Sequence, residues 1–262
     1  MQAQGLEPEK IQVEDRDFVA SLEKGLAVIE AFDTRRPRLT LADVAKLTGI
    51  TRAAARRYLR TLTRLGYAEF DGRFFSLTPR ILRLGYAYLS SASIPARLQP
   101  FLENISEETG ESSSAAMLDG DEIVYIARSA TRRIMSIGLG VGSRLPAYCT
   151  SLGRALLAYQ PEAEIEAYLD RVSLAPRTRF TITEAEKLRA VLLAVREQGY
   201  AAIDEELELG LRSIAVPVRP ENGSVKIAIN IGTQAVRYQT AEMVERFLPV
   251  LKAASQAIRY AL

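Results

Sequence analysis

Residues Thr51-Arg-Ala-Ala-Ala-Arg-Arg-Tyr-Leu-Arg-Thr-Leu-Thr-Arg64 decide how the first part of this 262-residue chain is built. Apolar residues recur in and just after this stretch at helical spacing, at Ala55, Tyr58, Leu59, Leu62 and Leu65. The five arginines of the stretch occupy the rest of the helix surface. A helix with one apolar face and one strongly positive face is typical of an element that enters a DNA groove. The stretch therefore favours transcriptional control over catalysis.

The flanking segments predict a winged helix–turn–helix over residues 18–78. Apolar spacing indicates a first helix over 21–32, and residues 35–38 are expected to form a loop. Thr40-Leu-Ala-Asp43 has the pattern of a capping box, which starts a short helix that Gly49 ends. Asp71-Gly72, between two aromatic-rich runs, predicts the hairpin of the wing.

The polar face of the arginine helix predicts the contacts with DNA. Arg52 and Arg56 are candidates for bidentate bonds to guanine, and the small Ala53 and Ala54 allow close approach to the bases. Arginines nearer the rim suit phosphates, which set position and salt dependence. The alternative is a solvated basic surface. The predicted DNA-binding residues are Thr40, Thr51, Arg52, Ala53, Ala54, Arg56, Arg57, Arg60, Arg64 and Arg73.

Composition separates the chain into a basic front and a mildly acidic remainder. Residues 1–99 carry 16 Lys and Arg against 11 Asp and Glu, whereas residues 100–262 carry 18 against 21. Histidine is absent, which excludes imidazole catalysis and His-containing zinc sites. Cys149 is the single cysteine, so no internal disulfide can form. Neither a secretory signal nor a membrane-spanning apolar run is evident, so we expect a cytoplasmic protein with no membrane partner.

The remainder of the chain predicts a linker helix over 79–95 and an α+β domain over 96–262. The expected arrangement is an antiparallel sheet with helices packed against it. A capping box formed by Thr183 and Glu186 is expected to open a helix that runs to Gly199. The expected strands are 112–118, 122–127, 134–139, 213–218 and 225–231, and the other expected helices are 98–108, 151–159 and a closing one capped by Thr240.

Four residue patterns in this domain are candidates for functional sites. Gly138-Leu-Gly-Val-Gly142 lacks the spacing of a dinucleotide loop, and a strand-end loop is favoured. No histidine can activate Cys149 as a nucleophile. The acidic run Asp204–Glu208 fits a solvated loop or helix start better than a metal site. Leu145–Arg154 is open between an ordinary capped helix and a ligand pocket at a helix start.

The residues together resemble the IclR family of bacterial transcription regulators along essentially the whole chain. The motifs that carry the resemblance are Ser21–Leu26, Leu41–Ala45, Thr48–Ile50, Leu65–Tyr67, Leu145–Tyr148, Thr150–Arg154, Gly199–Tyr200 and Glu205–Pro217. Thr51–Arg57, Ser76–Arg80 and Leu84–Ser91 are similar to the branch that regulates protocatechuate, 4-hydroxybenzoate and β-ketoadipate catabolism. The resemblance implies homodimers, often paired into tetramers, and a GAF-like effector-binding domain without cofactor or metal.

The resemblance also implies an effector site for a small organic or aromatic acid. Its residues would be Thr150, Ser151, Leu152, Glu205, Ser213, Asn230 and Gly232, with Arg132 and Arg133 as candidate carboxylate partners or a surface pair. Glu205 stands where many relatives have Gln, and Asn230-Ile-Gly232 departs from a common Asn-Val-Ser ending. The function expected is an effector-responsive regulator of an aromatic-acid catabolic operon, whose dimer contacts inverted half-sites on double-stranded DNA. The alternatives are a central-carbon regulator that senses a keto acid and an enzyme with an autoregulatory DNA-binding module.

Overall fold

The computed structural model describes residues 17–33, 35–91, 93–131, 139–219 and 224–261. The chain divides into two compact units, one up to Ser90 and one from Ser91 onward. This division falls inside the segment 79–95 that was predicted as a linker helix. We describe each unit by itself.

Three helices form the body of the first unit: α1 (Ala20–Glu30), α2 (Leu41–Thr48) and α3 (Arg52–Leu65). Their shared core contains Val28, Val44, Ala55 and Leu59, all fully or almost fully buried. The periodicity that predicted α3 is thus confirmed. Leu65 is the exception on the predicted apolar face, because 52% of its side-chain surface is exposed.

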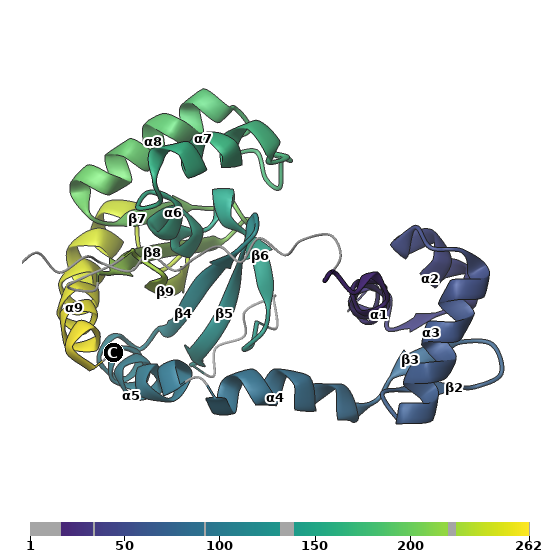
Figure 1. Cartoon of the computed structure of the whole chain (residues 1–262). Coiled ribbons are helices and arrows are strands. Elements are labelled where there is room, and N and C mark those ends of the chain that lie inside the picture. Colours follow the sequence, from purple (N-terminus) through teal and green to yellow (C-terminus); the bar gives the residue numbers. More distant parts are fainter. Residues whose placement is uncertain (1–16, 34, 92, 132–138, 220–223, 262) are drawn as a thin grey trace, which may run out of the picture. The chain divides into compact units, whose positions relative to one another are not determined.

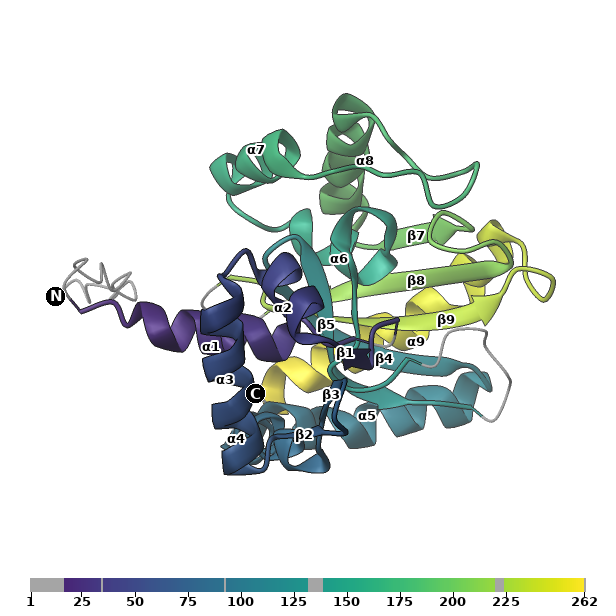
Figure 2. The ribbon, with the colours of Figure 1, turned by 90° about the vertical axis from the view of Figure 1, so that its right-hand side faces the viewer.

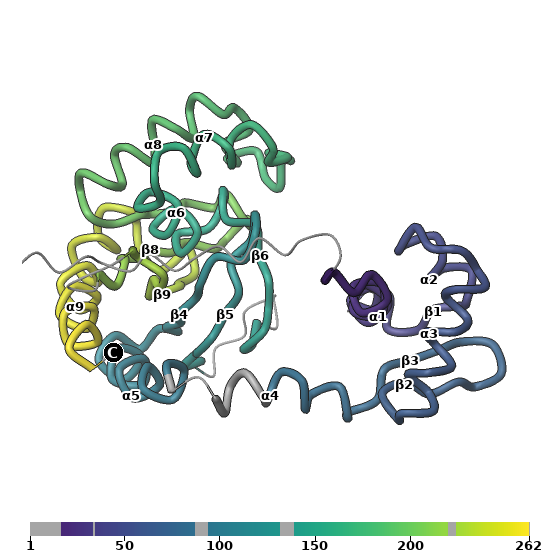
Figure 3. Tube along the Cα trace, viewed as in Figure 1, coloured from purple at the N-terminus to yellow at the C-terminus, as the bar shows by residue number. Residues whose placement is uncertain are grey.

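A small antiparallel sheet forms the wing. Its strands are β1 (Arg38–Leu39), β2 (Ala68–Phe70) and β3 (Phe75–Leu77), in the order β1-β3-β2 (Figure 3). The hairpin at Asp71-Gly72 is confirmed, with Phe70 paired to Phe75. The prediction of a loop over 35–38 is wrong at its end, because Arg38 pairs with Ser76 and so adds a strand.

The chain passes from the first unit to the second at the end of helix α4 (Leu82–Ser91). A 3₁₀ turn at Pro79–Ile81 leads into α4, and α5 (Ser93–Thr109) follows. Pro95 lies in the first turn of α5, where a missing backbone N–H costs nothing. The helix predicted over 98–108 therefore starts earlier than expected.

The second unit is built on a six-stranded antiparallel sheet in the order β6-β5-β4-β9-β8-β7. The predicted strands correspond to β4 (Ser112–Asp119), β5 (Glu122–Ser129), β8 (Leu211–Val218) and β9 (Ile227–Gln234). Two short strands, β6 (Arg144–Pro146) and β7 (Ala201–Asp204), were not predicted. The predicted strand 134–139 falls almost wholly outside the described residues.

Helices cover both faces of this sheet. α6 (Ser151–Leu157), α7 (Glu162–Arg171) and α8 (Ala185–Gln198) lie on one side, and α5 and α9 (Thr240–Ala261) lie on the other (Figures 1 and 2). Residues alternate along β9 between the two faces of the sheet. Ile227, Ile229 and Ile231 pack toward α5 and α9. Asn230 and Gly232 lie on the opposite face, toward α6. The α+β class with an antiparallel sheet is confirmed.

Two local predictions have different outcomes. Thr40 and Asp43 form the predicted capping box, with both reciprocal bonds present. The capping box at Thr183 is wrong, because α8 begins one residue later with Glu184 as its N-cap and no side-chain cap bond. Helix α7 was not predicted at all.

Candidate functional site

The polar face of α3 carries five arginines that are free to meet a polyanion. Arg52, Arg56, Arg57, Arg60 and Arg64 are all exposed. Within the described parts of the chain, none of these guanidinium groups forms an ion pair with a carboxylate. Ala53 is exposed and Ala54 half-buried beside them. The positive charge is therefore concentrated on one face and not neutralised locally, as phosphate binding requires.

Two of the residues predicted to contact DNA are N-caps of helices in the structure. The Thr51 hydroxyl accepts a hydrogen bond from the Ala54 backbone N–H at 3.2 Å and caps α3. The Thr40 hydroxyl accepts from the Asp43 N–H at 3.2 Å and donates to the Asp43 carboxylate at 2.7 Å. The bond from the hydroxyl to the carboxylate, together with a second bond from the Thr40 backbone N–H at 2.9 Å, holds the Asp43 pKa below its usual value. Contacts of Thr40 and Thr51 with DNA stay predictions.

Arg73 lies at the tip of the wing. Its backbone N–H donates to the Asp71 carboxylate at 2.9 Å, which tightens the hairpin turn. Its exposed guanidinium lies 5.1 Å from the centre of the Phe74 ring. A second guanidinium, from Arg38, lies at the same distance from that ring. Arg38 forms an ion pair with Asp71, so the positive charge that the wing presents beside this ring comes from Arg73.

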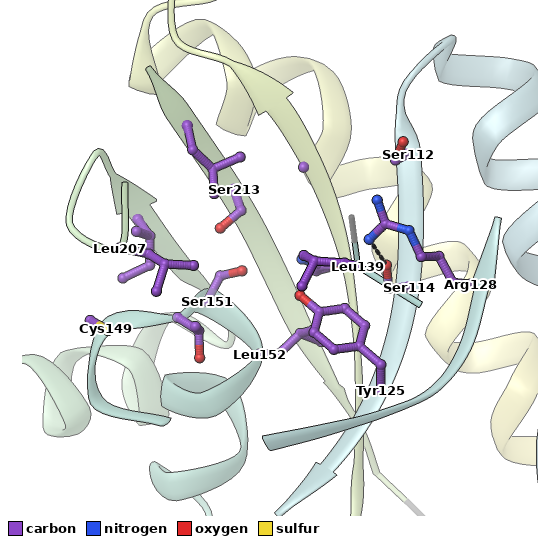
Figure 4. Close-up of a pocket in the computed structure, with 15 residues that line it drawn as sticks. Ser112, Ser114, Tyr125, Arg128, Leu139, Cys149, Ser151, Leu152, Leu207 and Ser213 are labelled. Carbon is purple, nitrogen blue, oxygen red and sulfur yellow. Dashed lines mark hydrogen bonds between the residues drawn. The ribbon is translucent and has the colours of Figure 1, made fainter. Parts of the chain in front are cut away.

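The second unit contains a cavity between the sheet and the start of α6. Its volume is about 30 Å³, enough for roughly two water-sized groups. A ring-sized ligand therefore requires the lining side chains to move apart. The lining residues are Ser112, Ser114, Tyr125, Arg128, Leu139, Cys149, Thr150, Ser151, Leu152, Ile203, Leu207, Leu211, Ser213, Asn230 and Gly232 (Figure 4).

Three buried polar atoms on the cavity wall lack hydrogen-bond partners in the described structure. They are Ser151 Oγ, Asn230 Oδ1 and Arg128 Nε. The side chains of Ser151 and Asn230 are more than nine-tenths buried. A buried polar group without a partner costs about 1–3 kcal/mol. Their convergence on one cavity indicates a place where a ligand supplies the missing partners.

The sheet register arranges the polar lining in two adjacent rows. Arg128 pairs with Ser114 across β5 and β4, and Ser114 pairs with Asn230 across β4 and β9. In the next row, Gly232 lies between Ser112 and Ser213. A Cβ added at Gly232 would meet no atom within 4 Å, and the backbone there does not need a glycine conformation. The glycine therefore leaves open space on the cavity floor.

Most of the predicted effector residues lie together on this cavity. Thr150, Ser151, Leu152, Ser213, Asn230 and Gly232 all line it. Glu205 does not: its carboxylate accepts a hydrogen bond from the Gly210 N–H at 2.8 Å, and its φ of 57° places it in a tight turn. Arg132 and Arg133 lie outside the described residues. Three lining residues were not predicted from the sequence. Tyr125 and Ser114 belong to strands that were predicted, and Arg128 lies one residue beyond the predicted end of the strand 122–127.

The start of α6 is held in place by a buried ion pair. Arg154, 2% exposed, donates to both carboxylate oxygens of Glu206, at 2.8 and 2.6 Å. Its Nε donates to the Tyr148 carbonyl at 2.8 Å. The Glu206 carboxylate also accepts from the Ile182 N–H at 3.2 Å. This network fixes the cavity-lining segment 149–152 against the loop before β8.

Asp204, in the acidic run, and Cys149 both have contacts that explain them as structural residues. Asp204 accepts hydrogen bonds from Arg212 at 2.6 Å and Thr240 at 2.8 Å; burial alone would raise its pKa, but these bonds lower it. Burial raises the Cys149 thiol pKa to about 11, so the thiol stays protonated. The described residues contain no cluster of three His, Cys, Asp or Glu that could hold a metal ion. Among them, no helix is long and apolar enough to span a membrane.

Two family models match the chain. The IclR helix–turn–helix domain matches residues 21–72, and the bacterial transcriptional regulator IclR C-terminal domain matches residues 86–260. The chain belongs to the IclR family. Members of this family are transcriptional regulators, which confirms the regulator expectation and overturns the enzyme alternative.

Relatives in the IclR family include regulators of aromatic catabolism. The chain is 49% identical to the Pca regulon regulatory protein of Pseudomonas putida over 249 residues, which is 95% of this chain and 86% of that protein. It is 40% identical to the p-hydroxybenzoate hydroxylase transcriptional activator of Acinetobacter baylyi over 254 residues, 95% and 93% of the two chains.

Solved structures of IclR-type proteins share the fold. A transcriptional regulator from Rhodococcus sp. RHA1 is 48% identical, with a TM-score of 0.79 and coverage of 94% of this chain and 98% of that one. An IclR homologue from Microbacterium hydrocarbonoxydans, solved in complex with 4-hydroxybenzoate, is 25% identical, with a TM-score of 0.75 and coverage of 93% and 99%.

Proposed function

We propose that this IclR-family protein regulates an aromatic-acid catabolic operon and responds to a small aromatic acid bound in the second unit. The observation that carries the proposal is the cavity at the start of α6. It combines three polar atoms without partners with an apolar wall that includes Leu139, Leu152 and Leu207. An aromatic acid offers this combination, because its ring is apolar and its substituents bond. The relatives named for Pca and p-hydroxybenzoate genes and the 4-hydroxybenzoate complex support the same ligand class.

The first unit delivers this response to DNA in the cytoplasm. The proposed contacts are the exposed arginines of α3 in the major groove and Arg73 of the wing on phosphates. The proposed boundaries are 18–78 for the DNA-binding domain, 79–95 for the linker helix and 96–262 for the effector-binding domain. Only a ligand with different affinities for two arrangements can shift the regulator between them.

A dimer, and a tetramer built from two dimers, is the proposed working form. Four large apolar residues in and just before α1 expose between 46% and 63% of their surface. They are Phe18, Val19, Leu22 and Leu26. An apolar patch of this kind marks an association surface. A twofold dimer would place two α3 helices on inverted half-sites one helical turn apart.

An effector screen by thermal shift tests the ligand class. A ligand that binds the folded protein at 100 times its Kd stabilises it by about 2.7 kcal/mol. We expect 4-hydroxybenzoate or protocatechuate to raise the melting temperature and pyruvate to leave it unchanged. A shift with pyruvate alone would support the central-carbon alternative and contradict the proposal.

Footprinting on the chain's own upstream region tests the DNA interface. The double variant Arg56→Ala with Arg57→Ala removes two exposed charges from α3, and we expect it to abolish protection. The charge-matched control, Lys226→Ala with Lys252→Ala, alters two exposed lysines of the second unit and should protect like the original chain. If both arginines contact phosphates, the slope of log K against log salt falls by about two for each helix. Unchanged protection in the arginine variant would overturn the assignment.

A further inference from the structure

Arg128 is the single charged side chain among the described residues that line the cavity. No carboxylate lines it in the described part of the chain, so the cavity has a net positive charge. The guanidinium carbon lies 6.0 Å from the centre of the Tyr125 ring. Burial raises the pKa of Tyr125 to about 12, so this phenol stays neutral and does not neutralise Arg128.

The Arg128 guanidinium has N–H donors that are not used in hydrogen bonds with the described residues. Its Nη1 donates to Ser114 Oγ at 3.2 Å, while Nε is buried and has no partner in the described structure. Withdrawing a cation from water is costly unless an anion replaces the lost hydration. A carboxylate does so best, since it accepts two parallel bonds from one guanidinium.

The start of α6 is a weaker place for a carboxylate. This helix has seven residues, and the Thr150 hydroxyl already accepts from the Gly153 N–H at 3.1 Å. What the helix offers to the cavity is the Ser151 hydroxyl, a neutral group that can both donate and accept. Figure 4 shows Ser151 and Arg128 on opposite sides of the cavity, with Tyr125 and Leu139 between them.

We infer that Arg128 binds the carboxylate of the effector and that Ser151 bonds to a hydroxyl at the far end of its ring. This orientation rests on the function proposed above. The carboxylate lies on the sheet, at the row formed by Arg128, Ser114 and Asn230. The ring extends toward α6 between Tyr125 and Leu139. The cavity thereby selects acids over neutral aromatics at one end and hydroxylated over plain rings at the other.

Three probes and two variants of the full-length protein separate these contacts by calorimetric titration. The probes are 4-hydroxybenzoate, its uncharged amide 4-hydroxybenzamide, and benzoate, which lacks the ring hydroxyl. We expect the original chain to bind 4-hydroxybenzoate about 10- to 100-fold more tightly than the amide, as a charge-assisted hydrogen bond implies. Arg128→Gln should remove most of that preference, and Arg128→Lys should retain part of it. Ser151→Ala should instead remove the preference for 4-hydroxybenzoate over benzoate.

The outcomes separate this inference from the function on which it rests. If the original chain binds none of the three probes, the proposed ligand class fails. If it binds 4-hydroxybenzoate but Arg128→Gln keeps the full preference over the amide, the orientation is overturned. Loss of the preference in Arg133→Gln, with Arg128→Gln unaffected, would move the carboxylate to the other candidate arginine. Arg144→Gln, which changes an exposed arginine of β6 paired with Asp119 and Glu122, is the control and should bind like the original.

Discussion

Replacing Arg154 with methionine should destabilise the second unit more than any exposed arginine substitution. The change removes both bonds to Glu206 and the bond to the Tyr148 carbonyl. Among the described residues, the Ile182 N–H is then the one remaining hydrogen-bond donor to the buried Glu206 carboxylate. Breaking a buried pair by deleting one partner costs about 3–5 kcal/mol. For a unit of this size each kcal/mol lowers Tm by about 2–4 °C, so we expect a loss of roughly 6–20 °C.

Thermal unfolding followed by circular dichroism on the full chain measures this loss. Arg171→Met is the matched control, because Arg171 forms an exposed ion pair with Asp121; such pairs contribute about 0–1 kcal/mol. The double variant Arg154→Met with Glu206→Leu should recover much of the stability, since it leaves no unpaired charge. An Arg154→Met variant that melts within about 2 °C of the original would refute the reasoning, as would a double variant no better than the single one.

Three further predictions concern the cavity and its surroundings. Gly153→Ala should prevent normal folding of the second unit, measured by its melting transition, because the added Cβ would lie 2.2 Å from the Ala147 carbonyl oxygen. Gly232→Val should leave Tm near the original value but weaken 4-hydroxybenzoate binding in calorimetry, since its side chain would occupy the open cavity floor; equal affinity would contradict this. Asp204→Asn should destabilise at neutral pH. Because the folded-state pKa of Asp204 is lowered, its stabilising contribution is present above the unfolded pKa of about 3.9 and is lost as pH falls through the folded value. The melting temperatures of the original chain and of the Asp204→Asn variant, measured as a function of pH, should therefore converge below about pH 4.

Elements with a strong local signal were predicted well. The apolar spacing of α3, the capping box at Thr40 and the glycines that end α2 and α3 all depend on interactions within a few residues. Gly49 and Gly66 have φ values of 69° and 79°, the left-handed conformation that stops a helix. Such features can be recognised without knowledge of the rest of the fold.

Elements that depend on distant partners were missed. Strand β1 has two residues and exists because Arg38 and Leu39 pair with β3, more than 30 residues away. β7 similarly depends on pairing with β8. No periodicity can be detected in segments of two to four residues, so only the assembled sheet identifies them.

The absence of Arg128 from the predicted site has a specific structural cause. Ile123 packs in the core on the α6 side of the sheet and Tyr125 lines the cavity, and strict alternation would send Arg128 to the opposite face. A bulge between Ala115 and Ala116 of β4, opposite the extra residue Ile126, shifts the register by one residue. Arg128 consequently points into the cavity. The position of such a bulge does not follow from the residue pattern alone.

Strand β4 is hydrogen-bonded through its side chains on both faces at once. Ser114 accepts from Arg128 on the cavity side, while the neighbouring Ser113 donates to the Leu102 carbonyl at 2.7 Å and lies 2.9 Å from the Ser106 hydroxyl, both on α5. A ligand that breaks the Arg128–Ser114 hydrogen bond would weaken the contacts of β4 on its cavity face. The other face of β4 is hydrogen-bonded to the 17-residue helix α5. Amide hydrogen exchange along α5 would thus report occupancy of a cavity that the helix does not line.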